Sequence, residues 1–307
     1  PLFLRPRNFD CVLALDGIRQ MLWGFFKKVV VADNCALFVN GVFENYQTLD
    51  GSTLFLGAFF FTIQIYGDFS GYSDIAIGCA RLFGIDLMQN FKYPYFSRDI
   101  AEFWRRWHIS LTTWFRDYIY IPLGGSRAGK WKSFRNTLVI FLVSGFWHGA
   151  NWTFVAWGAY HALLFLPLLL LGQNRRYRDS VAENSFLPSV KELTQMGATF
   201  LLVLLGWILF RSEDISQAAV YLERMFNVSL FSAPQLVGLG FGQLLLKKCF
   251  FFTALMFIVE WIGRKQAHGL MIEDLSLPVR YVIYTVLLII IYGFDASNPQ
   301  GFIYFQF

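Results

Sequence analysis

The chain has 307 residues, of which 56% are hydrophobic and 15% are charged. Soluble domains contain about 45–50% apolar and about 25% charged residues, so this composition is unusual for a soluble protein. The net charge is a modest +5, and the basic residues lie between apolar blocks, as expected near anionic lipid headgroups. We therefore predict a membrane protein that contacts the bilayer and binds no nucleic acid. A very apolar soluble helical bundle is the alternative.

Five nearly uncharged blocks predict helices that cross a membrane. A run of about 18 or more apolar residues can span the hydrocarbon core, and lipid offers no partners for backbone polar groups outside a helix. The shorter blocks reach this length only with their flanks. The fold class is therefore all-α, a polytopic transmembrane helical bundle. The blocks are residues 54–83, 138–171, 196–210, 249–262 and 279–294.

The domain organisation is predicted to be simple. We find no repeat and no low-complexity linker, so residues 1–307 are expected to form a single membrane domain. Residues 16–161 contain the motifs discussed below, and residues 173–307 contain further apolar helices. The chain begins with Pro1, and we expect N-terminal helices of the complete protein to be missing. The four cysteines show no CxxC spacing, so neither a disulfide framework nor a metal site is predicted.

Charged residues interrupt two of the predicted helices. Lys27 and Lys28 fall in the middle of a helix predicted over residues 16–43, which is interfacial or lies against protein or water there. Asp68 and Asp74 lie in the first apolar block, about 120° apart around the helix, and so do not form a carboxylate pair. Asp74 and Arg81 share a face and are expected to neutralise each other.

The second apolar block is too long for one membrane crossing. A continuous helix over residues 138–171 would extend about 51 Å, whereas the hydrocarbon core is about 30 Å thick. The helix must break, tilt or re-enter. Residues 145–152, Gly-Phe-Trp-His-Gly-Ala-Asn-Trp, are the natural place for a break. This places His148 at membrane depth.

His148 is the strongest candidate for a catalytic residue. A titratable side chain inside a membrane block is costly and marks a functional site by default. An imidazole titrates near neutrality, so it can take a proton from a hydroxyl and return it to a leaving group. Ser144 and Asn151 would lie on the same side of a helix as His148, and either of them could fix the ring tautomer. The alternative is a structural histidine that is hydrogen-bonded across helices.

His108 lies in a segment, residues 103–117, that concentrates Trp and Arg. A helix is expected to start at Asp99, whose side chain suits a helix cap, and to run to about Pro122. Trp104 and His108 would share one stripe of this helix. Such a segment suits a lined cavity or a membrane interface. The alternative is an amphipathic interfacial helix in which the histidine has no function.

The remaining histidines have simpler interpretations. His161 is expected to serve in packing or in a hydrogen bond between helices, and His268 is expected to be solvated in a polar loop. The sequence contains no G-x-S-x-G elbow and no H-E-x-x-H motif. A serine nucleophile of the hydrolase type and a zinc site are therefore not indicated.

Glycines spaced four residues apart predict places where helices approach closely. Such spacings also arise by chance in a chain with 25 glycines. The pairs are Gly67/Gly71, Gly145/Gly149 and Gly238/Gly242.

Six short motifs follow one another in a fixed order. They are Tyr-Gly-Asp-Phe-Ser-Gly-Tyr-Ser-Asp at 66–74, Asn-Phe-Lys-Tyr-Pro at 90–94, Phe-Trp-Arg-Arg-Trp-His-Ile-Ser-Leu at 103–111, Trp-Phe-Arg-Asp-Tyr at 114–118, Pro-Leu-Gly-Gly at 122–125 and Phe-Trp-His-Gly-Ala-Asn-Trp at 146–152. This combination resembles the membrane-bound O-acyltransferase family, and most closely its bacterial alginate O-acetylation branch. The resemblance covers about residues 16–161 and is weaker beyond residue 173.

The resemblance implies a membrane fold with broken or re-entrant helices around a central tunnel. It implies transfer of an acyl group, acetyl in the first place, from a cytoplasmic thioester donor to hydroxyls of an extracytoplasmic, alginate-like exopolysaccharide. The donor would be acetyl-CoA or an acyl carrier, and no bound cofactor is implied. The expected location is the bacterial inner membrane, with an extracytoplasmic acetyltransfer protein as partner. Transfer of D-alanine, or acyl transfer to peptidoglycan, by the same fold is an alternative.

The family's embedded histidine corresponds to His148, and its second functional histidine corresponds to His108. We hypothesise that His148 is the general base and that His108 orients the donor or stabilises charge. Arg105 and Arg106 would neutralise a phosphate-bearing donor. A transporter with a histidine proton relay, and a purely structural subunit, are the rival classes. Further candidates for substrate binding are Trp104, Trp147, Asn151 and Asp68.

Overall fold

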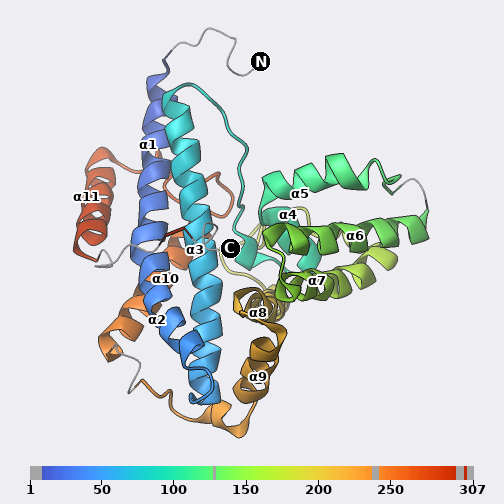
Figure 1. Ribbon diagram of the computed structural model, residues 1–307. Coiled ribbons are helices and arrows are strands. Elements are labelled where there is room, and N and C mark those ends of the chain that lie inside the picture. Colours follow the sequence, from blue (N-terminus) through green and yellow to red (C-terminus); the bar gives the residue numbers. More distant parts are fainter. Residues whose placement is uncertain (1–8, 127–128, 237–241, 295–300, 303–307) are drawn as a thin grey trace. The chain divides into compact units, whose positions relative to one another are not determined.

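The computed structural model describes residues 9–126, 129–236, 242–294 and 301–302 (Figure 1). Within these ranges the regular structure is helical and no β-strand occurs, so the predicted fold class is confirmed. The helices are α1 (Cys11–Phe25), α2 (Asp33–Glu44), α3 (Gly51–Leu82), α4 (Ile100–Arg106), α5 (Ile109–Phe115), α6 (Lys130–His148), α7 (Trp152–Leu170), α8 (Val190–Arg211), α9 (Ile215–Met225), α10 (Gln243–Ile262) and α11 (Leu277–Gly293).

The chain folds into two compact units. Unit 1 draws on Pro1–Glu44, Phe59–Gln89 and Leu236–Gln306, and it contains α1, α2, most of α3, α10 and α11. Unit 2 draws on Asn45–Ala58 and Asn90–Gln235, and it contains the first turns of α3 and all of α4 to α9. The expectation of a single domain over residues 1–307 stays a prediction.

In unit 1, α1 and α3 lie side by side at glycine contacts (Figure 1). A Cβ atom added to Gly17 would lie 2.6 Å from the carbonyl oxygen of Gly78. One added to Gly24 would lie 2.6 Å from the carbonyl oxygen of Gly71. No side chain fits at these distances, because backbone lies directly opposite. The close approach predicted for the first glycine pair is therefore confirmed at Gly71.

Charged side chains in the interior of unit 1 pair with one another. The Nζ atom of Lys27 lies 2.6 Å from the carboxylate of Asp74. The Nζ atom of Lys28 lies 2.8 Å from Asp33 and 2.5 Å from Asp68. Moving a charged side chain from water into the protein interior costs roughly several kcal/mol of free energy unless an opposite charge lies close by. The two lysines therefore lie against protein, which was one of the predicted environments.

Two predictions for unit 1 are wrong. Asp74 pairs with Lys27 and not with Arg81, which forms its ion pair with Asp16. His268 is not solvated: it is 2% exposed, and its Nε2 atom lies 3.0 Å from a carboxylate oxygen of Asp16. Spacing along one helix could not reveal these pairs, because each partner comes from a different element.

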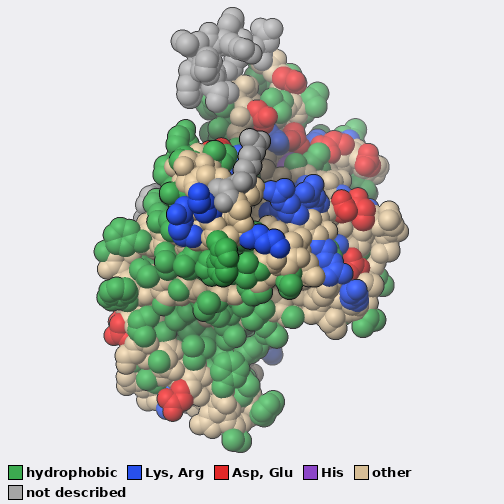
Figure 2. Space-filling model, turned by 90° about the vertical axis from the view of Figure 1, so that its right-hand side faces the viewer, with side chains coloured by type: hydrophobic (Ala, Val, Ile, Leu, Met, Phe, Trp, Pro, Cys, Tyr) green, Lys and Arg blue, Asp and Glu red, His purple; other side chains and the backbone are tan. Residues whose placement is uncertain are grey.

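Two of the described helices, α7 and α8, are long and apolar enough to cross a membrane. α7 is the second part of predicted block 138–171, and α8 contains predicted block 196–210. The other three blocks form α3, α10 and α11, and α11 is apolar but only 17 residues long. Hydrophobic side chains cover a broad area of the face shown in Figure 2. Large exposed apolar areas of this kind are expected where protein meets lipid or another protein.

Candidate active site

His148 lies at the break in the second apolar block. It is the last residue of α6, and α7 begins at Trp152, so the break occurs where the sequence predicted it. Asn151 caps α7: its side-chain oxygen accepts a hydrogen bond from the Thr153 backbone N–H at 3.1 Å. Its amide nitrogen donates to the carbonyl oxygen of Glu213 at 2.6 Å. Asn151 thus anchors the turn to the segment that follows α8, and its role in fixing the ring tautomer of His148 stays a prediction.

The same break allows α6 and α7 to lie side by side in unit 2 (Figure 1). A Cβ atom on Gly145 would lie 2.2 Å from the carbonyl oxygen of Phe154, and one on Gly149 would lie 2.7 Å from the ring of Phe154. The second glycine pair therefore marks a close approach, as predicted. In the third pair, Gly242 has open space around it, and Gly238 lies outside the described residues.

The ring of His148 lies among aromatic rings from two neighbouring helices. The ring of Trp157 in α7 is perpendicular to it, with centroids 5.3 Å apart. The rings of Phe210 in α8 and Phe154 in α7 lie 5.0 Å and 6.2 Å away. His148 is only partly buried. An imidazole that is positioned in this way can take a proton from a hydroxyl group that comes within hydrogen-bond reach.

His108 occupies a left-handed turn between two short helices. Its φ and ψ angles are 46° and 56°, α4 ends at Arg106, and α5 begins at Ile109. The prediction of one continuous helix from Asp99 to about Pro122 is therefore wrong, because the helix is interrupted between Arg106 and Ile109. The predicted start is confirmed, because the Asp99 carboxylate accepts a backbone N–H one turn further on at 2.7 Å. The stripe that would have joined Trp104 to His108 does not form.

Backbone hydrogen bonds on both sides hold His108 in this turn. The N–H of Lys92 donates to the carbonyl oxygen of Arg106, and the N–H of Ile109 donates to that of Asn90, both at 3.0 Å. A non-glycine residue in the left-handed region costs about 1–2 kcal/mol. Such conformations persist where the surroundings over-determine them, and they cluster at functional sites.

Trp147 lies beside both candidate catalytic histidines. Its ring centroid is 6.1 Å from that of His108 and 4.9 Å from that of His148. The structure thus brings together three residues that the sequence singled out. Burial lowers the pKa of His108 to about 4. Its imidazole is therefore neutral at pH 7, with one ring nitrogen as a donor and the other as an acceptor.

Trp104 and His161 pack against Trp157, which in turn contacts His148. His161 is fully buried, and its ring lies 5.0 Å from Trp104, 5.2 Å from Trp157 and 5.4 Å from Tyr160. Neither ring nitrogen has a hydrogen-bond partner among the described residues, so the packing alternative is confirmed for His161. The sequence did not single out Trp157, although its ring contacts both His148 and His161.

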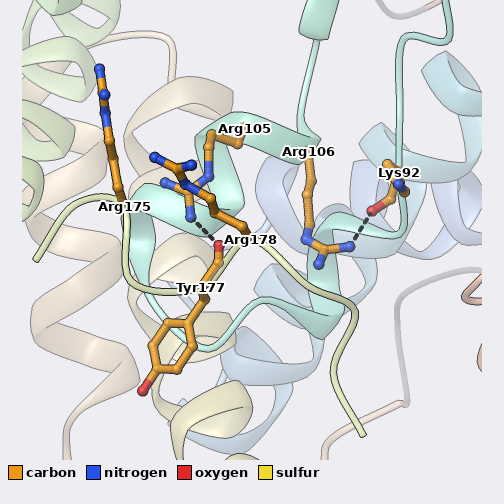
Figure 3. Close-up of a pocket in the computed structure, with 6 residues that line it drawn as sticks. All are labelled: Lys92, Arg105, Arg106, Arg175, Tyr177 and Arg178. Atoms are coloured by element: carbon orange, nitrogen blue, oxygen red, sulfur yellow. Dashed lines mark hydrogen bonds between the residues drawn. The ribbon is translucent and has the colours of Figure 1, made fainter. Parts of the chain in front are cut away.

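The other predicted site residues lie in two places. Arg105 and Arg106 line a cavity of about 400 Å³ in unit 2 (Figure 3). Asp68 lies in unit 1, where its carboxylate is paired with Lys28. Three further residues of the cavity come from the connection between α7 and α8, and the sequence suggested only a basic cluster there. They are Arg175, Tyr177 and Arg178.

Comparison with known proteins identifies the family to which the sequence is similar. The membrane-bound O-acyltransferase family matches residues 18–184, which include both His108 and His148. The chain is 41% identical over 236 residues to the probable alginate O-acetylase AlgI of Pseudomonas aeruginosa, covering 75% of this chain and 43% of that protein. It is 38% identical over 227 residues to the peptidoglycan O-acetyltransferase of Helicobacter pylori, covering 74% and 41% respectively.

A more distant relative is the teichoic acid D-alanyltransferase of Bacillus subtilis, with 29% identity over 213 residues, 66% of this chain and 52% of that protein. The chain spans less than half the length of the two closer relatives named above. The family match nevertheless covers more than half of this chain, including the break at His148 and the turn at His108. The chain therefore belongs to the membrane-bound O-acyltransferase family.

Proposed function

We propose that this protein transfers an acyl group, acetyl in the first place, from a cytoplasmic thioester to hydroxyls of an extracytoplasmic, alginate-like polysaccharide. It would do so as a multi-pass protein of the bacterial inner membrane. The observation that carries the proposal is the position of His148, which is partly exposed at a helix break beside His108 and Trp147. The similarity to an alginate O-acetylase supports the choice of acyl group and acceptor.

In the proposed reaction His148 acts as the general base. Its ring nitrogen accepts the proton of the acceptor hydroxyl while the hydroxyl oxygen attacks the thioester carbonyl carbon. The new C–O bond forms, the C–S bond breaks, and the proton passes from His148 to the departing sulfur. Exchange of a thioester for an ester needs little driving force from the protein, so the site mainly supplies a base and alignment.

His108 is proposed to act on the donor. A neutral imidazole can donate one N–H to the thioester carbonyl oxygen, where negative charge develops during attack. The backbone bonds around His108 hold this donor in place before substrate arrives. No bound cofactor is required by this scheme, and an extracytoplasmic acetyltransfer protein is its proposed partner.

Peptidoglycan is the second candidate acceptor, because the Helicobacter pylori relative is almost as similar as the alginate O-acetylase. The D-alanyltransferase relative is less similar to this chain, so it supports transfer of D-alanine more weakly than the other two relatives support transfer of acetyl. Membership in an acyltransferase family favours catalysis of acyl transfer over the alternative that the protein is a transporter.

The test uses the complete protein with His148→Ala and His148→Gln. A positioned general base contributes about 10²–10⁴-fold, so acetyl groups on surface polysaccharide should fall to background in both variants. Mass spectrometry of isolated polysaccharide and peptidoglycan measures the acetyl content and identifies the acceptor. Equal amounts of each variant in the membrane fraction serve as the control for folding. Wild-type acetylation in His148→Ala would end the proposal, and solute flux without acetyl transfer would favour a transporter.

A further inference from the structure

A buried group of ionisable side chains lies in unit 1 and takes no part in the acyl transfer proposed above. α10 supplies Glu260, which is 1% exposed, and α3 supplies Tyr66 and Asp74. Lys27, which is 3% exposed, comes from η1 (Phe26–Ala32), a π-helical segment between α1 and α2. π-Helical turns are rare and occur frequently at functional sites. Ionisable side chains inside a membrane domain likewise mark a functional site by default.

One lysine of this group faces two carboxyl groups. The Nζ atom of Lys27 lies 2.6 Å from the carboxylate of Asp74 and 3.9 Å from that of Glu260. The first contact is a charge-assisted hydrogen bond, whereas 3.9 Å is too long for a hydrogen bond. Lys28, the neighbouring buried lysine, is paired separately, as described above. Within the described ranges, the charged groups that act on Glu260 are Lys27 and Asp74. The charges of this group therefore balance only if one of the two carboxyl groups is neutral.

The hydrogen bonds of Glu260 suit a neutral carboxyl group. The hydroxyl oxygen of Tyr66 lies 2.8 Å and 2.9 Å from the two carboxyl oxygens of Glu260. A hydroxyl has only one hydrogen to donate, so it cannot satisfy both oxygens of a carboxylate. Among the residues that the structure describes, no other hydrogen bond reaches this carboxyl group. A buried carboxylate with so few donors carries a large cost in free energy, and a bound proton removes this cost.

The surroundings of Asp74 suit a carboxylate. In addition to the contact with Lys27, a carboxylate oxygen of Asp74 accepts a hydrogen bond from the amide nitrogen of Gln20 at 2.8 Å. The side chain of Asp74 is 14% exposed, whereas that of Glu260 is 2% exposed. Two donors and contact with water stabilise the ionised form. Asp74 is therefore the better place for the negative charge.

We propose that Lys27, Asp74 and Glu260 form a proton-exchange site, in which Glu260 is protonated while Lys27 pairs with Asp74. In the second state of the site Lys27 pairs with Glu260. The O–H bond of Glu260 is then broken, and a carboxylate oxygen of Asp74 holds the proton. Each state contains one proton, one ammonium group and one carboxylate, so the total charge does not change. The lysine has to move little, because its Nζ atom already lies 3.9 Å from Glu260. Asp74 can exchange its proton with water, because part of its side chain is exposed.

Infrared difference spectroscopy of the complete protein in detergent tests the protonation of Glu260. A protonated carboxyl group has a C=O stretching band that an ionised carboxylate lacks. The spectrum of the wild type minus that of Glu260→Gln should contain this band at pH 7. Glu223→Gln is the matched control, because it makes the same substitution at an exposed position, and its difference spectrum should lack the band. Absence of the band from the Glu260→Gln difference would overturn the proposal.

Asp74→Asn tests the exchange between the two carboxyl groups. Without the Asp74 carboxylate, Glu260 is the remaining acidic partner of Lys27 and should ionise. The band that Glu260→Gln removes should therefore also be lost in Asp74→Asn. Its persistence in Asp74→Asn would show that Lys27 does not move between the two carboxyl groups, and would overturn the exchange.

Thermal unfolding in the same detergent gives a readout that does not depend on band assignment. Glu260→Gln replaces a protonated carboxyl group by an amide of similar shape, so the unfolding midpoint should change by less than about 2 °C. Lys27→Gln leaves a buried carboxylate without its partner and should lower the midpoint by about 5 °C or more. A decrease in Glu260→Gln as large as that in Lys27→Gln would show that Glu260 is ionised and paired with Lys27, and would overturn the proposal.

Discussion

His108 is buried in a strained turn, and its protonation is therefore coupled to folding. Its pKa falls from an ordinary value of 6.5 to about 4 in the folded protein because burial disfavours the charged ring. Between these values the unfolded chain binds a proton that the folded protein does not. The free energy of unfolding therefore rises with pH in this window, and stability is lost as pH falls from about 6.5 towards 4.

We expect His108→Gln to reduce the sensitivity of the protein to acid. Between pH 7 and pH 5 this histidine should account for about 2 kcal/mol of lost stability, which the glutamine variant would not lose. The measurement is the thermal unfolding midpoint of both proteins at the two pH values in one detergent. The decrease in the unfolding midpoint from pH 7 to pH 5 should be smaller for His108→Gln than for the wild type, whatever the midpoint of the variant at pH 7. Equal drops would show that His108 is not held neutral by burial.

At the scale of helices, the contact between α6 and α7 determines where His148 lies. The two helices approach through reciprocal glycine contacts, since a Cβ on Gly158 would lie 2.3 Å from the carbonyl oxygen of Phe141. A Cβ atom on Gly145 would lie 2.2 Å from the carbonyl oxygen of Phe154. Any side chain at either glycine must push the helices apart, because the opposing atoms are backbone.

We therefore expect Gly145→Ala to destabilise the protein by about 1–3 kcal/mol and to lower acetylation as His148 moves away from its aromatic neighbours. Gly197→Ala is the matched control, because that glycine in α8 has nothing within 4 Å of an added Cβ. It should stabilise the protein by up to about 1 kcal/mol. Thermal unfolding and acetylation assays of the two variants provide the comparison. Equal behaviour of both variants would contradict the close helix contact.

For the whole molecule, α7 and α8 give a definite expectation about membrane topology. The bond from Asn151 to the carbonyl oxygen of Glu213 joins the start of α7 to the end of α8. The connection over residues 171–189 joins their other ends. Since each helix is long and apolar enough to cross a membrane, the connection and Glu213 should lie on opposite sides.

This arrangement can be tested with cysteines introduced one at a time. In a background where the exposed Cys11 and Cys79 are alanine, Asn184→Cys should react with an impermeant maleimide only in inside-out vesicles. Glu213→Cys should react only in intact cells. The sign follows from the basic residues of the connection, Arg175, Arg176 and Arg178, because loops rich in arginine and lysine favour the cytoplasmic side. Labelling of both positions from one side would contradict two crossings by α7 and α8.

Several features were determined by the sequence alone, because they depend on local properties of the chain. The length of the second apolar block required a break, and the glycines around His148 located it. The cap at Asp99 was predictable because a capping residue acts within one turn. The order of the motifs identified the family, which the comparisons confirm over residues 18–184.

Only the tertiary structure decided which distant side chains meet. The turn at His108 was not predictable from its helical surroundings, because the backbone bonds that impose it come from Asn90 and Lys92. Likewise, Arg81 reaches Asp16 and not a neighbour on its own helix. The cationic cavity brings together segments about seventy residues apart, as in the bond from Arg105 to Tyr177. Periodicity in the sequence shows which residues share one face of a helix. The tertiary fold decides which residues from other helices and loops pack against that face.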